Sequence, residues 1–473
     1  MSSIQSLFDP SLNFERRVEK VITFSNREPD ILLNEARDYV LTDNLTNEYQ
    51  KLLNQFEDAH SQDSKSIDCC TWLSGFYGSG KSSFAKYFGL CFDQTAQIAD
   101  TPFYEHFTKR LPNVPLQQQV KTLAKKYNVV VFLLDLASQG TAGANHTPIS
   151  TLLFDQVCSW AGYPADRKLG ELALFLELQG RFEEFKTVVQ EISGMDYEAL
   201  KDFSVILVPV ASQAAHRLYP NIWKDADAFQ NTQAISTKNE QERLLDMLTL
   251  IEKKAGTRRV MFIIDEVGHF LRNNESLINN FDGLAKNIRE LGKGEAWLIA
   301  TAQQTIPKTG PLFGLQDRFP IKIDLKASDI REITHKRLLK KSGDGAKQLH
   351  AAFLTHGAKL NLATRLVGCE GYPTLDEATF VDFYPLLPQQ FELLIRTISA
   401  LAKMHGGVGL RSAIRCVEDI LLDVRLNATS VLEAPTGTLV TAAHLYDVLE
   451  KDIVSAAREI CLQVDGIGAM YGK

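Results

Sequence analysis

The 473-residue sequence lacks the cysteine patterns that bind zinc or form disulfide frameworks. Its seven cysteines are scattered along the chain, and no two of them have Cys-x-x-Cys spacing. Structural zinc sites need such closely spaced pairs, and disulfide-bonded domains need an even number of cysteines. The sequence therefore argues against both classes and favours a protein of a reducing compartment.

Long hydrophobic runs are also missing. Residues 1–17 already contain four charged side chains, so they lack the uninterrupted apolar core of a signal peptide. The most apolar internal stretch, residues 129–134, is far shorter than the roughly 20 residues that a transmembrane helix needs. We therefore expect a cytoplasmic protein with no membrane partner.

An excess of positive charge is absent as well. Lys and Arg total 51 against 58 for Asp and Glu, which gives a net charge of -7. Such a chain is not a general polycation that coats nucleic acid, although a net charge is compatible with a local basic groove. Internal repeats and low-complexity tracts are absent, which excludes a fibrous protein. At about 100–200 residues per domain, the length predicts two to four domains.

The order of hydrophobic patterns divides the chain into four parts. Residues 1–65 are predicted to be an N-terminal helical segment. Residues 66–326 alternate strands and helices and predict an α/β domain with a parallel sheet, interrupted by a helical insertion at about 145–245. Residues 327–430 are predicted to be a helical lid, and residues 431–473 a C-terminal helical extension.

Five short apolar runs are predicted to be strands of the parallel sheet: 67–73, 129–136, 259–265, 296–301 and 321–325. A run that is apolar on both faces is typical of a strand covered by helices on both sides. One further run, residues 205–210 in the insertion, is also strand-like. A helix is expected over residues 276–291, and helices of the lid over 328–341, 346–360, 387–404 and 408–425.

The strongest motif is Gly-Phe-Tyr-Gly-Ser-Gly-Lys-Ser at positions 75–82, which fits the phosphate-binding loop G-x-x-x-x-G-K-[ST]. Glycines let backbone N–H groups surround phosphates, the lysine reaches the β- and γ-phosphates, and the serine hydroxyl binds Mg²⁺. A helix that starts there directs its positive end at the nucleotide. The predicted nucleotide-binding residues of this motif are Gly75, Tyr77, Gly78, Ser79, Gly80, Lys81, Ser82 and Ser83.

The second motif is an apolar strand that ends in two acids, Asp265 and Glu266. In such a Walker B element the first acid holds Mg²⁺, directly or through water, and the second polarises the attacking water. We therefore expect Asp265 to bind nucleotide and metal with Ser82. Asp135 also ends an apolar strand, but it has no neighbouring glutamate and is better explained as a strand or loop cap.

The next strand ends in Thr301 and Gln303. A polar side chain there could contact the γ-phosphate or the attacking water, and Gln303 is favoured over Thr301; a plain strand-end turn is the alternative. Farther on, Arg318 could reach the nucleotide of a neighbouring subunit and stabilise the charge of the transition state. The alternative for Arg318 is a surface or intrachain ion pair.

A glycine-rich stretch before the helix at 408–425 resembles a sensor 2 element. There Arg411 of the lid would bend back onto the phosphates, and Arg415 is the second choice; a helix-surface role is the alternative for either arginine. His269 follows Asp265 at a spacing of four, but no second ligand lies at a useful distance in sequence, so a packing or loop role is favoured over a metal site.

The order of these elements, followed by a helical lid, resembles the AAA+ ATPases, and most closely their origin-recognition branch. Four stretches, at positions 72–84, 264–270, 297–303 and 384–391, resemble the BrxC/PglY ATPases of BREX phage-defence systems. The last of them reads Tyr-Pro-Leu-Leu-Pro-Gln-Gln-Phe and, with the Asp-Glu-Val-Gly of the second, points to this family rather than to P-loop proteins in general. The start of the chain shares this resemblance, which covers most of the sequence.

This resemblance implies a P-loop NTPase fold of the AAA+ type. It also implies ATP and Mg²⁺ as cofactors, a homo-oligomer, and action with a DNA methyltransferase and other BREX proteins in defence against phage. BrxC-like proteins are considerably longer than this chain. The expectation is therefore either the N-terminal ATPase part of a longer protein or a shorter relative.

The sequence thus predicts an ATPase that catalyses in-line attack of water on the γ-phosphate. Its expected catalytic residues are Glu266, Lys81, Gln303, Arg318 and Arg411. A nucleotide-gated scaffold with little turnover could have the same sequence, and a RecA-like DNA translocase is a third interpretation, which the lid disfavours. Direct DNA binding is left open, and the negative charge makes protein partners at least as plausible.

Overall fold

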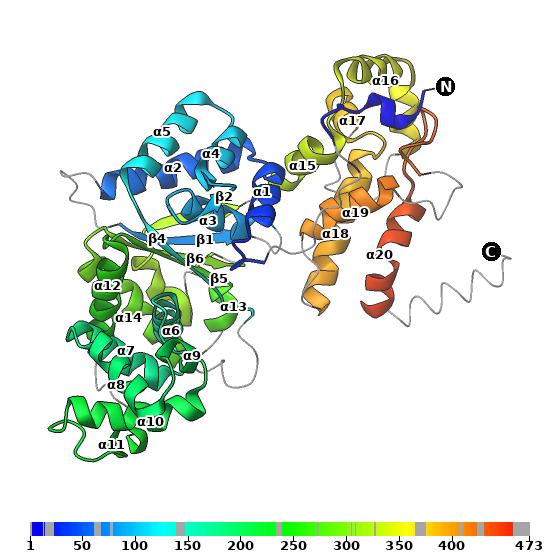
Figure 1. Cartoon of the computed structure of the whole chain (residues 1–473). Helices are drawn as coiled ribbons and strands as arrows, with labels where there is room; N and C mark the ends of the chain where they lie inside the picture. Colours follow the sequence, from blue (N-terminus) through cyan, green and yellow to red (C-terminus); the bar gives the residue numbers. More distant parts are fainter. Residues whose placement is uncertain are drawn as a thin grey trace.

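The structure is a computed structural model of the whole chain. It describes residues 2–12, 14, 23–60, 68–75, 79–138, 147–232, 239–271, 274–303, 305–307, 309–325, 328–364, 375–405, 410–422 and 430–456. These residues form two lobes, the sheet lobe (residues 23–325) and the helical lobe (residues 2–12 with 328–456) (Figure 1). Each lobe has its own hydrophobic core.

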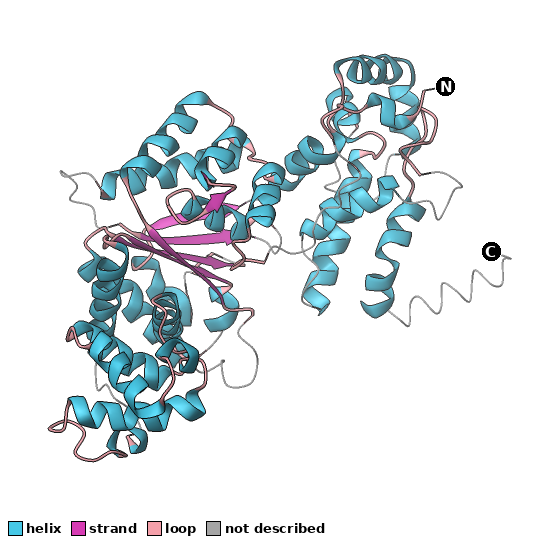
Figure 2. Cartoon of the chain, viewed as in Figure 1, coloured by secondary structure: helices cyan, strands magenta, loops and turns pink. Residues whose placement is uncertain are grey.

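A five-stranded sheet lies at the centre of the sheet lobe, in the order β4-β5-β6-β1-β7, and all neighbouring strands are parallel (Figure 2). Its strands are β1 (Cys70–Gly75), β4 (Val130–Asp135), β5 (Val260–Asp265), β6 (Ala296–Ala302) and β7 (Ile321–Leu325). A small antiparallel pair, β2 (Gln97–Ile98) and β3 (Thr101–Pro102), lies apart from it. All five strands predicted from the apolar runs are therefore confirmed.

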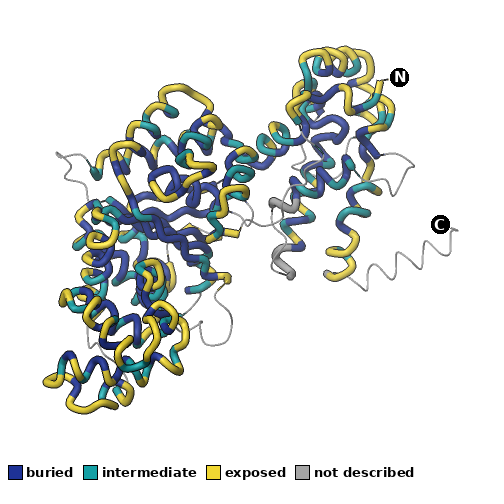
Figure 3. Tube along the Cα trace, viewed as in Figure 1, coloured by how far each residue is buried: buried dark blue, intermediate teal, exposed yellow. Residues whose placement is uncertain are grey.

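The central strands β1, β5 and β6 are buried along their whole length. Figure 3 shows the sheet as a continuous buried layer. This explains why their sequences are apolar without alternation, since both faces of a parallel sheet are covered by helices. The edge strand β7 instead alternates buried and exposed residues.

Helices cover the two faces of the sheet. In Figure 1, α2, α3, α4 and α5 lie on one side, and α6, α12 and α14 lie on the other. Outside the insertion between β4 and β5, the helices of the sheet lobe are α1 (Pro29–Asp38), α2 (Asp43–Ala59), α3 (Lys81–Leu90), α4 (Phe103–Phe107), α5 (Val114–Lys126), α13 (Val267–Leu271) and α14 (Glu275–Gly292). Short 3₁₀ turns cover Thr108–Arg110 and Pro311–Asp317.

The helical insertion between β4 and β5 contains α6 (Ile149–Trp160), α7 (Arg167–Leu178), α8 (Phe182–Ser193), α9 (Tyr197–Leu200), α10 (Ser204–Leu218), α11 (Ala228–Asn231) and α12 (Glu240–Ala255). The strand expected at 205–210 is wrong, because this run forms the start of α10. Leu207, Ala211 and Ala214 are fully buried there at helical spacing. The local β-branched run is thus overridden by a longer pattern with a period of 3.6 residues.

The helical lobe contains α15 (Ser328–Thr334), a π-helical turn (His335–Leu339), α16 (Gly343–Thr364), α17 (Glu377–Phe383), α18 (Pro388–His405), α19 (Leu410–Leu422) and α20 (Ala442–Ala456). The helix expected over 328–341 therefore changes from α to π geometry along its length. No helix in the described parts of the chain is both long enough and apolar enough to cross a membrane.

The first residues of the chain belong to the helical lobe. Residues 2–12, here called the N-terminal strap, donate backbone hydrogen bonds to the carbonyls of Leu432 and Ala434 at 2.8 and 2.9 Å. The backbone N–H of Asp9 donates to the carbonyl of Lys340 at 2.9 Å, and the two side chains form an ion pair at 2.9 Å. The strap is thus joined to segments that lie more than 300 residues away in sequence.

Three apolar side chains of the strap complete the core of the helical lobe. Ile4 and Leu7 lie in a 3₁₀ turn, Ile4–Leu7, and are buried with Phe8 among the lobe's helices. Helices α1 and α2, in contrast, belong to the core of the sheet lobe. The segment predicted as residues 1–65 therefore contacts both lobes.

The start of the helical lobe is fastened to helices α1 and α2. The carboxylate of Asp329, 3% exposed, accepts hydrogen bonds from the Thr42 hydroxyl at 2.7 Å and from the Asn44 amide at 3.0 Å. Arg337 also pairs with Asp38 at 3.0 Å. These contacts hold α15 and the π-helical turn against the sheet lobe.

Candidate functional site

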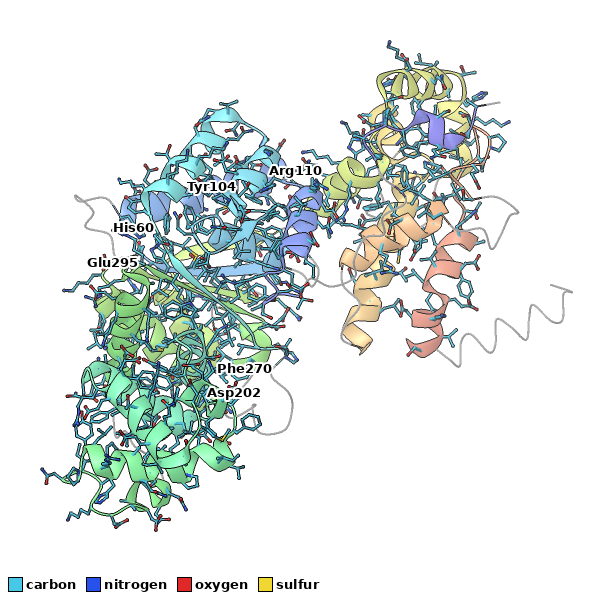
Figure 4. The ribbon with its side chains drawn as sticks, in the orientation of Figure 1. His60, Tyr104, Arg110, Asp202, Phe270 and Glu295 are labelled. Atoms are coloured by element: carbon cyan, nitrogen blue, oxygen red, sulfur yellow. The ribbon has the colours of Figure 1, made fainter. Side chains whose placement is uncertain are left out.

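The described residues of the phosphate loop, the acid pair and the polar end of β6 gather at the carboxyl ends of β1, β5 and β6, beside the start of α3. Because β6 lies between β1 and β5, the ends of three neighbouring parallel strands meet at one edge. In Figure 4, Glu295, which precedes β6, lies at the opposite end of the sheet from Phe270, which follows β5. The carboxyl edge of an open parallel sheet is the usual place of a ligand site in α/β proteins.

The loop between β1 and α3 depends on two glycines. Gly75 has a φ of +152° and Gly80 a φ of +93°, values that favour glycine. A Cβ atom on Gly75 would lie 2.8 Å from the Ser79 hydroxyl oxygen and 2.9 Å from the carbonyl oxygen of Leu325. The start of the loop therefore has no room for a side chain.

Helix α3 begins at Lys81, as the motif predicts. The Lys81 side chain is buried, and so is Ser83, while Ser82 is partly exposed. N–H groups in the first turn of a helix have no intrahelical acceptors, and together with the helix dipole they attract anions. Two other predicted loop residues, Tyr77 and Gly78, lie outside the described residues.

Asp265 is bound through both carboxylate oxygens. The Ser82 hydroxyl donates to its Oδ2 at 2.7 Å, and the Thr301 hydroxyl donates to its Oδ1. Burial raises the pKa of Asp265, while the two hydrogen bonds and the nearby Lys81 ammonium oppose this effect. The structure thus joins the phosphate-loop serine and the Walker B aspartate, two residues 183 positions apart in sequence.

Glu266 has an unusual backbone conformation for a residue with a side chain, with a φ of +61°. Its N–H donates to the Thr301 hydroxyl oxygen at 3.1 Å, and its carboxylate accepts a hydrogen bond from the Gln303 amide at 3.2 Å. Partial burial is the main cause of the raised pKa of Glu266, and the positive charge of Lys81 opposes this rise. The two residues predicted at the end of β6 therefore both contact the acid pair.

Asp135 lies beside Asp265 in the register of β4 and β5. Its carboxylate accepts the backbone N–H of Ala137 at 2.9 Å, so it closes a turn at the end of β4. This is the cap role favoured for Asp135 from the sequence. Its negative charge contributes to the raised pKa of Asp265 and of Glu266.

Arg318 forms an ion pair within its own chain. Its guanidinium donates to both carboxylate oxygens of Asp282 on α14, at 2.9 and 3.3 Å. This hydrogen bonding raises the pKa of Arg318. In the single chain Arg318 therefore forms the intrachain ion pair that was the alternative to an arginine-finger role. Its contact with the nucleotide of a neighbouring subunit stays a prediction.

The two arginines that the sequence assigns to a lid lie on α19, in the helical lobe. Arg411 lies in its first turn, and its side chain is outside the described residues. Arg415 lies one turn later, with its Nε 3.7 Å from Asp419. A contact of either arginine with a nucleotide stays a prediction.

The described histidine, cysteine and acidic side chains do not form a metal site by themselves. His269 is exposed on α13, and within the described ranges no group of three or more His, Cys, Asp or Glu could hold a metal ion. The five described cysteines are buried, and none of them forms a disulfide.

The site nevertheless fits a magnesium nucleotide. The Ser79 hydroxyl is buried and has no hydrogen-bond partner among the described residues, which leaves a donor for a phosphate oxygen. Ser82 and Asp265 supply oxygen atoms, the ligands that Mg²⁺ prefers. Lys81 adds a cation beside them. Glycines, donors and acids of this arrangement can hold a phosphate chain and one divalent cation.

Two residues that shape this region are not identified by the sequence patterns. Asp282, the partner of Arg318, lies on the surface of a long helix where no spacing singles it out. Gly268 allows α13 to approach the end of β6, since a Cβ atom there would lie 3.0 Å from the Cβ of Ala302. A glycine two residues after the acid pair is the signal that could have indicated this close approach.

No protein-family model matches the chain. Among solved structures, the chain is similar to a protein described as "Structure of C. elegans PCH-2", with a TM-score of 0.30 and 11% sequence identity. The similarity covers 90% of this chain and 72% of that one.

Proposed function

We propose that the chain binds ATP with Mg²⁺ and hydrolyses it as an ATPase of the AAA+ type. The observation that carries this proposal is the hydrogen-bonded network in which Ser82, Thr301 and Gln303 hold the two acids Asp265 and Glu266. It lies directly at the start of α3, where the phosphate loop ends. Loop, acids and polar strand end thus occupy one edge of one sheet.

The chemistry proposed for this site is transfer of the γ-phosphoryl group to water. Lys81 and the first-turn N–H groups of α3 bind the β- and γ-phosphates, and Glu266 takes a proton from the attacking water. The water oxygen bonds to the γ-phosphorus as the bond to the bridging oxygen breaks, which yields ADP and phosphate. When bound by Ser82 and Asp265, Mg²⁺ neutralises charge on the phosphates. A raised pKa makes Glu266 a stronger base than an ordinary glutamate.

The strand order supports the AAA+ part of this proposal. A strand, β6, is inserted between the phosphate-loop strand and the strand of the acid pair. Its polar end therefore reaches the place where a γ-phosphate and water would meet. The helical lobe that follows β7 is proposed to act as the lid, and its Arg411, like Arg318 of the sheet lobe, is proposed to act when subunits and lobes close around ATP.

Two variants test this function by separating ATP binding from turnover. We expect Lys81→Ala to lose ATP binding. Glu266→Gln should keep ATP binding but lose about 10²–10⁴-fold in kcat, the usual contribution of a general base. Lys286→Ala and Glu275→Gln, at exposed positions of α14, are the matched controls. Wild-type turnover in both site variants would contradict the proposal.

A nucleotide-gated scaffold is the second candidate, and the pair between Arg318 and Asp282 favours it. An arginine held by its own chain is not free to stabilise the transition state in a neighbouring subunit. ATP-dependent assembly with negligible turnover would indicate the scaffold. ATP-driven strand separation would instead indicate a RecA-like translocase.

The biological setting proposed is BREX-type phage defence in the cytoplasm. The support is the resemblance of four sequence stretches to BrxC/PglY ATPases, with a homo-oligomer, a DNA methyltransferase and other BREX proteins as partners. Plating of phage on cells that carry the Lys81→Ala variant tests the defence role. Turnover with and without duplex DNA, at two salt concentrations, tests direct DNA contact, because binding through phosphates weakens steeply as salt rises.

A further inference from the structure

We propose that Thr301 is the positioning residue of this site, with its hydroxyl holding both acids in the geometry needed for turnover. This inference rests on the proposed ATPase function and concerns the residue that was the second choice, after Gln303, for contact with phosphate or water. The geometry points to a different task. Thr301 acts through Asp265 and Glu266 rather than on the substrate.

The hydroxyl of Thr301 is fully committed to the two acids. Its hydrogen goes to Oδ1 of Asp265, and its oxygen accepts the N–H of Glu266 at 3.1 Å. A hydroxyl has one hydrogen to donate, so Thr301 has none left for a phosphate oxygen. Thr301 is also completely buried. Thr301 therefore contacts both acids from within the protein core and not from the solvent.

The first consequence concerns the orientation of Asp265. With Oδ1 held by Thr301, the carboxylate cannot rotate freely, and its Oδ2 stays directed at the Ser82 hydroxyl at 2.7 Å. These are the two residues proposed to hold Mg²⁺. Groups that orient a metal ligand in this way commonly change metal affinity about 10- to 100-fold when they are removed.

The second consequence concerns the backbone of Glu266. A left-handed conformation is costly for glutamate and persists only where the surroundings fix it. The Thr301 hydroxyl accepts the backbone N–H of Glu266, and the side-chain amide of Gln303 donates to the Glu266 carboxylate, so both ends of this residue are held. Loss of the hydroxyl would release the base as well as the metal ligand.

The test compares Thr301→Val, which keeps the shape and removes the hydroxyl, with Thr301→Ser, which keeps the hydroxyl. Three quantities are measured: kcat, the Mg²⁺ concentration for half-maximal turnover, and binding of a non-hydrolysable ATP analogue with and without Mg²⁺. For Thr301→Val we expect kcat to fall on the order of 100-fold, as for misplaced catalytic groups, and the Mg²⁺ requirement to rise about tenfold. Analogue binding without Mg²⁺ should be unchanged.

Thr301→Ser should recover most of both losses, and Thr71→Val is the matched control. Thr71 lies on the neighbouring strand β1, is equally buried, and its hydroxyl has no hydrogen-bond partner among the described residues. Its substitution should change neither kcat nor the Mg²⁺ requirement. If Thr301→Val does not fold, Thr301→Ser and Thr301→Cys provide a second pair of nearly equal size, in which only serine keeps the hydroxyl.

The outcomes separate this inference from the proposed function. An unchanged kcat and Mg²⁺ requirement in folded Thr301→Val, beside an active wild type, would overturn the positioning role alone. Equal impairment of Thr301→Ser and Thr301→Cys would also overturn the positioning role, because packing would then explain the loss. A wild type without turnover would overturn the ATPase proposal itself.

Discussion

Each lobe contains a lysine that packs on the N-terminal part of the chain, but the partners of the two ammonium groups differ. In the sheet lobe, Lys86 of α3 has no exposed side-chain area and pairs with Glu35 of α1 at 2.9 Å. Its ammonium also donates to the carbonyl of Thr23 at 3.2 Å. This lysine has a carboxylate partner that compensates its burial.

In the helical lobe, Lys341 is partly buried and has no such compensation. Its ammonium donates to the backbone carbonyls of Leu339 and Asp382 and lies 4.7 Å from the centre of the Phe8 ring of the strap. Burial lowers the pKa of Lys341 to about 7, against the opposing effect of the Asp382 charge. Carbonyls and a ring thus do not replace a carboxylate as the partner of a buried ammonium.

The largest expected effect is the loss of the carboxylate in the sheet lobe. Glu35→Gln should lower the free energy of unfolding by about 3–5 kcal/mol, because it leaves the buried Lys86 charge without its counter-ion. All four tryptophans lie in the sheet lobe, so urea unfolding followed by their fluorescence reports this lobe. Asp30→Asn, an exposed acid of the same helix, should change stability by less than about 0.5 kcal/mol.

The double variant Glu35→Gln/Lys86→Met sharpens the same comparison. Removal of both charges should restore most of the loss, since the cost of Glu35→Gln arises from the charge left behind. A double variant as unstable as Glu35→Gln alone would show that the pair acts through its shape rather than its charge.

The second expected effect is a gain of stability from Lys341→Met. The folded pKa of Lys341 is about 7 and its ordinary value is 10.5, so between these values the unfolded state binds more protons. The free energy of unfolding of the wild type therefore rises with pH over this window. The gain from Lys341→Met should be largest below pH 7 and shrink towards pH 10.

Far-UV circular dichroism reports the helices of both lobes, whereas tryptophan fluorescence reports the sheet lobe alone. The gain is therefore measured on the circular dichroism transition that the fluorescence does not show. Lys347→Met, at a side chain that is 82% exposed, is the control and should show no such pH dependence. A gain that is constant between pH 6 and pH 9 would contradict the role assigned to burial of the Lys341 ammonium.

The smallest expected effect is at the exposed end of the strap. Hydrogen bonds from Ser11 and Lys340 lower the pKa of Asp9, so its carboxylate contributes stability above its ordinary pKa and loses it as pH falls. Asp9→Asn should therefore weaken the helical lobe slightly at pH 7 and not at acidic pH. Hydrogen exchange of strap amides detects so small a change, and a loss as large as that of Glu35→Gln would refute the expected order of effects.

The sheet and the start of α3 could be predicted because their signals are local. An apolar run that ends in an acid, or a glycine loop followed by Lys81, contains the information within ten residues. These signals also place Ser82, Asp265 and Glu266 at one edge of a parallel sheet, once the strands are known to be neighbours. The sequence also identified Thr301 and Gln303 as residues near the two acids, but it could not predict which hydrogen bonds they make.

Features that depend on distant partners could not be predicted in the same way. The pair of Arg318 with Asp282 joins a loop and a helix surface whose sequences show no sign of each other. The strap has an unremarkable composition, and its place in the helical lobe is set by Leu432 and Ala434. In α10 the local β-branched run even indicated the wrong element, because burial at helical spacing decided the outcome.

The strap also has a consequence for synthesis. Ser2 and Thr436 share a hydrogen bond of 3.0 Å although they are 434 residues apart. At about 5–20 residues per second, a ribosome needs roughly 20 to 90 s to make the intervening chain. For most of that time Ile4, Leu7 and Phe8 lie outside the ribosome without the helices that cover them. The strap is thus made long before the segments that it binds, and until then the nascent chain exposes three apolar side chains that a chaperone could bind.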